Sequence, residues 1–284
     1  MRRSLSQQKE VKARLYQQFL SLVRENQGLC LSVFEVLQPH LYRYLEAETV
    51  LCPFKMELLF ESAAATVELS EPFASLLLAC LHCLIVHADS ARSGGTRMDP
   101  RMIEFRRRID SVLERLVKCA LEDFGLDKSG DFSGSSVVGF TNAWKASTLL
   151  RVHEAFIEYL YYTEGLTVDS SEVILKVFHL GDDLRWALRK GAGKKKVEPL
   201  PSVMTLLCVA HLADALFGDP TASKQQAKDI LSEDDGMVKF VVQLALHNVQ
   251  MVITSVVCLI CLLLSHIIFL RLFFPLLPPA DEGK

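Results

Sequence analysis

Residues 99–125 read DPRMIEFRRRIDSVLERLVKCALEDFG, and this stretch has the pattern of an amphipathic helix. Asp99 and Pro100 are typical of a helix start, and Gly125 is typical of a helix end. Apolar residues recur between them every three or four positions, at Met102, Phe105, Ile109, Val112, Leu116 and Ala120. That spacing places them on one side of a helix. The stretch therefore predicts one helix that runs from Asp99 to a cap at Gly125.

The same spacing recurs along most of the chain. It predicts further helices over residues 4–28, 70–88, 138–162, 170–190, 201–217 and 223–231, and from residue 236 onward. In the segment 70–88, Ser70 is the expected N-cap and Pro72 lies in the expected first turn. No segment alternates apolar and polar residues for long enough to indicate a strand, so residues 1–250 are expected to contain no sheet.

The predicted fold class is all-α. Consecutive helices are joined by short or moderate links, and their faces are too apolar to remain uncovered. Both features favour stacked antiparallel helix pairs, as in an α-solenoid or a large bundle. Because no fixed-period repeat is present, the expected solenoid is irregular.

Composition sets broad limits on function. The chain has 284 residues, half of them apolar, which is enough for a substantial core. Its 31 basic and 34 acidic residues give a net charge of -3, so contact with nucleic acid would depend on local basic clusters. The N-terminal sequence MRRSLSQQKEVK has no apolar leader segment, and the eight cysteines are expected to be reduced thiols inside the cell.

Cys80, Cys83 and His87 share one face of a predicted helix and could in principle ligate zinc. Structural zinc usually has four ligands, and these three residues lie among leucines and isoleucines, which favours core packing. No nucleophile, base and orienting acid occur at a recognisable spacing. We therefore expect no enzyme activity and no cofactor, and metal analysis would test the zinc alternative.

Two basic clusters remain as candidate contacts. Arg106, Arg107 and Arg108 lie within a predicted helix, and a second cluster surrounds a helix end and a loop. The candidate DNA-phosphate contacts are the members of that second cluster: Arg185, Arg189, Lys190, Lys194, Lys195 and Lys196. Such residues can release counterions from phosphates, whereas the alternative is a solvated protein surface.

Several motifs together resemble one family, the Fanconi anaemia group I proteins. In chain order they are RRSLSQQKEVKARLYQQF (2–19), LLACLHCL (77–84), LEDFGLDKSGDFS (121–133), FIEY (156–159), ALFGD (215–219) and FVVQLALHNVQ (240–250). The third motif is the most specific, because a generic amphipathic helix would not require its thirteen residues. The resemblance extends from about Arg2 to Val252.

The resemblance implies a nuclear, non-enzymatic α-solenoid that pairs with the group D-two paralogue, clamps DNA and acts in interstrand cross-link repair. Residues 1–90 resemble the later part of the family's second helical domain. Residues 91–99 would be a linker, and residues 100–250 resemble the start of the third solenoid. The family's linker is acidic, unlike DSARSGGTRMDP here, and its ubiquitin-accepting lysine lies upstream of the matching region. Ser6 with Gln7 forms a minimal phosphorylation site for damage-response kinases.

The segment from Met251 to Phe274 differs from everything before it. It has no Asp, Glu, Lys or Arg until Arg271, and its length as a helix matches a bilayer's hydrocarbon core. A polar tail follows at residues 275–284. Because the family resemblance stops within a helix, we expect non-family sequence here, from a translated intron or a gene-model error. The alternative is a single-pass, tail-anchored membrane adaptor with a cytosolic helical domain.

Overall fold

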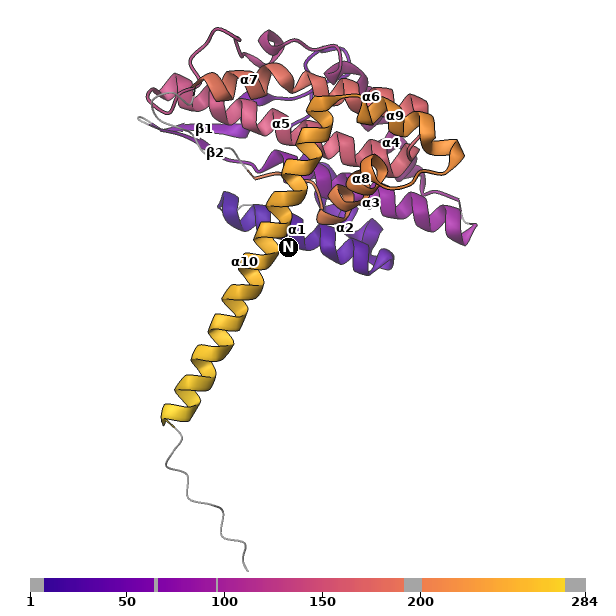
Figure 1. Cartoon of the computed structure of the whole chain (residues 1–284). Coiled ribbons are helices and arrows are strands. Elements are labelled where there is room, and N and C mark those ends of the chain that lie inside the picture. Colours follow the sequence, from indigo (N-terminus) through magenta and orange to yellow (C-terminus); the bar gives the residue numbers. More distant parts are fainter. Residues whose placement is uncertain (1–7, 64–65, 96, 192–200, 274–284) are drawn as a thin grey trace, which may run out of the picture.

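A computed structural model describes residues 8–63, 66–95, 97–191 and 201–273 (Figure 1). The α-helices are α1 (Lys9–Glu25), α2 (Cys30–Tyr42), α3 (Phe73–Gly94), α4 (Pro100–Leu116), α5 (Val137–Glu164), α6 (Val168–Leu180), α7 (Asp182–Gly191), α8 (Leu206–Phe217), α9 (Gln225–Ser232) and α10 (Asp235–Phe273). Short 3-10 helices are η2 (Gln27–Leu29), η3 (Met56–Leu59), η4 (Leu121–Phe124) and η5 (Ala222–Lys224). The predicted all-α class is confirmed.

One short hairpin departs from that prediction. Strands β1 (Phe60–Ala63) and β2 (Thr66–Leu69) pair antiparallel, with Phe60 opposite Leu69. The expectation that residues 1–250 contain no sheet was therefore wrong at this place. Each strand has four residues, which is too short to give a clear period-two signal in the sequence.

The helices pack in a progressive order that follows the chain. The buried helix α3 contacts α1, α2 and α5, and α5 in turn contacts α6 and α7. Helix α9 then packs on α6, and α8 packs on α10. Each helix thus packs on helices up to three places away in chain order, as in an irregular α-solenoid. Figure 1 shows α10 projecting from this body as a long, straight rod.

Several helix ends differ from the predicted ones. Helix α4 ends at Leu116 instead of Gly125, because the chain turns and η4 begins where the Asp123 carboxylate accepts a hydrogen bond from the Ala120 backbone N–H at 2.7 Å. Gly125 caps η4 with a left-handed φ of 65°. Helix α3 begins at Phe73, so Ser70 is not its N-cap.

Two further differences concern helix number. The segment 170–190 forms two helices, α6 and α7, separated at Gly181. A Cβ atom at that glycine would lie 2.8 Å from the ends of the Leu150 and Arg185 side chains, so a larger residue would require these side chains to shift. Helix α2 was not predicted, and Pro39 lies within it near its C-terminal end.

The predicted linker at residues 91–99 is short in the structure. Helix α3 continues to Gly94, Gly95 caps it with a φ of 59°, and α4 begins at Pro100 after the Asp99 carboxylate accepts from the Arg101 N–H at 2.8 Å. One hydrophobic core contains residues from both sides of this link. The division into units 1–90 and 100–250 stays a prediction.

Candidate functional site

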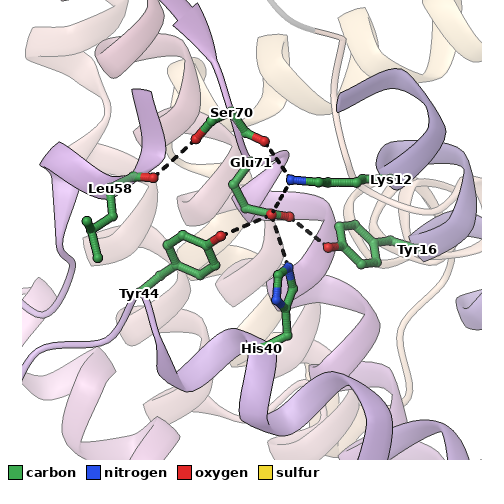
Figure 2. Close-up of polar contacts among 7 residues, drawn as sticks. All are labelled: Lys12, Tyr16, His40, Tyr44, Leu58, Ser70 and Glu71. Carbon is green, nitrogen blue, oxygen red and sulfur yellow. Dashed lines mark hydrogen bonds and ion pairs between the residues drawn. The ribbon is translucent and has the colours of Figure 1, made fainter. Parts of the chain in front are cut away.

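Glu71 lies just before α3, is 0% exposed, and has four hydrogen-bond partners (Figure 2). Its carboxylate accepts hydrogen bonds from Tyr16 at 2.7 Å and Tyr44 at 3.1 Å. Lys12 Nζ lies 3.1 Å away, and His40 Nε2 lies 3.0 Å away. These partners come from α1, from α2 and from the segment after α2. One carboxylate, placed just before α3, therefore joins the first three helices.

The electrostatics of this network are consistent with an ionised carboxylate. Burial alone raises the pKa of Glu71, but hydrogen bonds from His40 and Tyr16 and the charge of Lys12 more than offset it, and the pKa lies below its usual value. Burial and the Glu71 charge raise the pKa of Tyr16, so that its hydroxyl remains a donor. A buried charge with four partners is stabilising only while those partners stay in place.

Two further carboxylates, Glu154 and Glu158, lie one turn apart on α5. Glu158, also fully buried, lies 2.7 Å from His82 Nε2 of α3 and accepts from the Thr205 hydroxyl at 2.6 Å and the Thr205 N–H at 2.8 Å. Glu154 accepts from the Ser202 hydroxyl at 2.8 Å and the Val203 N–H at 3.0 Å. The two carboxylates thus hold the segment before α8 against α5.

This arrangement extends into the start of α8. The Thr205 side chain is its N-cap and accepts a hydrogen bond from the Cys208 N–H at 3.2 Å while it donates to Glu158. Burial raises the pKa of Glu154, and its hydrogen bonds to Ser202 and Val203 oppose that rise. In both networks, carboxylate oxygens are occupied by side-chain or backbone donors. Their chemistry is that of structural acceptors that fix the register of neighbouring helices.

The described members of the predicted basic cluster have different surroundings. Arg185 is half-buried, lies 4.1 Å from the Phe178 ring centroid, and donates to the Phe178 carbonyl at 2.5 Å. Burial lowers its pKa, although the 3.1 Å ion pair with Asp182 opposes this effect. Arg185 therefore joins α6 to α7, and its assignment as a possible DNA-phosphate contact stays a prediction.

Arg189 and Lys190 are exposed at the C-terminal end of α7, as a surface contact requires. Lys194, Lys195 and Lys196 lie outside the described residues, as does Ser6. The prediction missed Trp186, which is 46% exposed on the same helix. Its signal was available in the sequence, because Trp186, Arg189 and Lys190 have the i, i+3, i+4 spacing of one helix face.

The other basic cluster consists of paired side chains. Arg106 forms a 2.8 Å ion pair with Glu164, and Arg107 forms a 2.7 Å pair with Glu104. The Arg108 guanidinium lies 4.3 Å from the ring centroid of Tyr42. These three arginines belong to the local surface of α4, in keeping with the solvated-face interpretation.

Cys80 and Cys83 lie in the core. Burial raises the pKa of the Cys80 thiol, and hydrogen bonding with Cys30 together with burial raises the pKa of the Cys83 thiol. His87 Nε2 accepts a hydrogen bond from the Asp99 N–H at 3.0 Å. Within the described ranges, no group of three or more His, Cys, Asp or Glu side chains is placed to hold a metal ion. The three residues therefore have packing and capping contacts in place of a shared ligand geometry.

The apolar C-terminal segment continues α10, whose described part ends at Phe273, one residue before the predicted limit at Phe274. Among the residues that the structure describes, two helices could cross a membrane by length and composition alone. The first, α3, is 83% buried in the core, whereas the span Asp235–Thr254 of α10 is 11% buried. Leu246, Val249 and Ile253 are among the exposed residues of α10.

Comparisons with known proteins identify the family. The model of the FANCI helical domain 2 matches residues 1–188 and so continues across the predicted linker at 91–99. The Fanconi anemia group I protein of Gallus gallus is 31% identical over 262 residues, and its homolog from Mus musculus is 28% identical over 266 residues. These alignments cover 88% and 90% of this chain but 20% of each relative. The chain therefore belongs to the Fanconi anemia group I protein family and spans about a fifth of the length of the relatives it matches.

Proposed function

We propose that this chain is a non-enzymatic scaffold segment for repair of DNA interstrand cross-links in the nucleus. The observation that carries the proposal is the family match over residues 1–188, within an all-α stack. In this proposal the chain acts by pairing with the group D-two paralogue and by clamping DNA. The buried carboxylate networks would keep the helices in the register that such a binding surface needs.

The test compares two kinds of DNA damage in cells that lack this gene product. A bifunctional mitomycin forms interstrand cross-links, whereas its monofunctional analogue alkylates one strand. Loss of the chain should sensitise cells to the bifunctional compound, and re-expression should restore resistance. Equal sensitivity to the two compounds would contradict a role in cross-link repair.

Pairing and DNA contact have separate tests. Co-purification of the tagged chain with the group D-two paralogue from nuclear extract is expected, with Glu71→Gln as a variant that weakens the first helices. Purified chain should bind DNA weakly, with an affinity that falls as salt rises. Binding that is independent of salt would rule out phosphate contacts as its source.

A second candidate function follows from α10, whose span Asp235–Thr254 is mostly exposed and apolar. Residues 251–270 lack Asp, Glu, Lys and Arg, and a helix of that length spans about 30 Å. We propose as the alternative a tail-anchored membrane adaptor. An endogenous product of about 32 kDa that remains in membranes after carbonate washing would favour the anchor. A much larger nuclear product would favour the repair scaffold.

A further inference from the structure

Trp186 lies on the outer face of α7 among cationic side chains. Lys190 Nζ lies 4.9 Å from its ring centroid, and Lys128 Nζ, from the loop after η4, lies 5.9 Å from it. Arg189 is on the same exposed helix face. Packing of α7 is provided by other residues, since Leu184 and Ala187 are buried. The exposed indole is therefore not required for the hydrophobic core.

The charged side chains around this indole differ in whether they have a partner of opposite charge. Lys128 forms an ion pair with Asp183, and Asp182 is paired with His179 at 2.8 Å and with Arg185. The carboxylates of α7 are thus already neutralised. Arg189 donates from Nε to the Arg185 carbonyl at 3.2 Å, and Lys190 lies over the Trp186 ring. Within the described part of the chain, neither of these two cations has a carboxylate partner.

We infer that Trp186, Arg189 and Lys190 form a stacking platform for the unpaired bases of single-stranded DNA. An aromatic ring can stack on any base, and adjacent cations can contact the phosphates. Duplex DNA would engage the cations alone, because its bases are already stacked on one another. On binding, Lys190 would leave the ring for a phosphate, and a base would take its place. The inference rests on the proposed contact with DNA and specifies its preferred form.

The test uses the full chain and two probes of known composition, a labelled twenty-nucleotide oligothymidylate and a duplex of equal length. Fluorescence anisotropy is expected to show tighter binding of the single strand. Trp186→Ala should weaken that binding about tenfold and leave duplex binding nearly unchanged. Trp186→Phe should retain most of the affinity, because it keeps an aromatic face.

Two controls separate stacking from charge. In a Trp144→Phe background Trp186 is the remaining tryptophan, since the chain has two, and oligothymidylate should quench its fluorescence. Lys190→Gln should weaken both DNA forms and flatten the single-strand salt dependence by about 0.7 in slope. Circular dichroism of each α7 variant should match that of the chain with the same residue at position 144, because the substituted side chains of α7 are exposed.

Three outcomes would overturn the inference. If both DNA forms bind but Trp186→Ala changes neither affinity and no quenching occurs, the stacking platform fails while DNA contact remains. If neither form binds, the proposed contact with DNA fails as well. If vesicles containing phosphatidylserine shift the Trp186 emission to the blue and displace the oligothymidylate, the face is a membrane contact.

Discussion

Replacement of Glu71 by Gln should destabilise the fold more than any other single-atom change in the first helices. The substitution keeps the shape of the side chain but removes its charge. Lys12, whose side chain is 12% exposed, would then lack its buried counter-ion at 3.1 Å. An amide N–H would also replace one of the oxygen atoms that now accept hydrogen bonds from Tyr16, Tyr44 and their neighbours.

The expected size of the effect follows from these contacts. Breaking a buried ion pair by removing one partner costs about 3–5 kcal/mol, and loss of one neutral hydrogen bond costs about 1 kcal/mol. Because Tyr16 and Tyr44 hydroxyls can rotate to accept from the new amide, we expect the lower end, about 3 kcal/mol. Tyr44→Phe is the matched control and should cost about 1–2 kcal/mol, since it removes a single donor.

Urea denaturation followed by circular dichroism at 222 nm measures both changes. The pKa of Glu71 is depressed in the folded state, so its contribution is fully present at neutral pH and is lost as pH falls below about 4.3, the usual value in an unfolded chain. The difference between the original chain and Glu71→Gln should therefore shrink in acid. A difference under about 0.5 kcal/mol at pH 7, or one that grows in acid, would refute the reasoning.

Three further substitutions test other parts of the structure. Thr205→Val should lower the free energy of unfolding by about 1–2 kcal/mol, because it removes the N-cap of α8 and a donor to Glu158, and thermal denaturation would measure the loss. Arg185→Met should destabilise by about 1–3 kcal/mol, whereas Arg189→Met should change stability by less than about 0.5 kcal/mol; equal effects in urea would contradict the buried role of Arg185. Replacing Lys194, Lys195 and Lys196 by Ala should flatten the dependence of log affinity for duplex DNA on log salt by about 2–3 units, and an unchanged slope would assign them to the solvated surface.

Helices were predictable from the sequence where one face had to be buried. The apolar positions Met102, Phe105 and Ile109 are each fully buried in α4, as their spacing indicated. Helix ends were harder to predict, because they depend on local capping: Asp123 starts a separate turn before Gly125 and so shortens α4. The hairpin was not predictable, since four-residue strands give almost no periodic signal.

Only part of the candidate site could be predicted from the sequence. Arg189 and Lys190 were identified from a run of cations, but Arg185 in the same run is bonded to the Phe178 carbonyl and to Asp182. The run itself does not show which of its cations the junction of α6 and α7 partly buries. Glu71 and Glu158 gave no signal, because a carboxylate's burial depends on donors from distant segments. Thr205, for example, lies 47 residues from the Glu158 that it contacts.

The two carboxylate networks and the surface of α7 therefore have separable roles. Each network joins segments that are close in space and distant in sequence. In a solenoid, where each unit contacts only its neighbours, these hydrogen bonds help to fix the position of one helix relative to the next. Trp186 lies outside both networks. Loss of the Glu158 carboxylate should loosen the packing of α8 without altering the exposed surface of α7. Loss of the Trp186 side chain should leave the packing of the helices intact. If DNA binds at α7 as proposed, stability and the contact surface depend on different residues, so each can be changed alone.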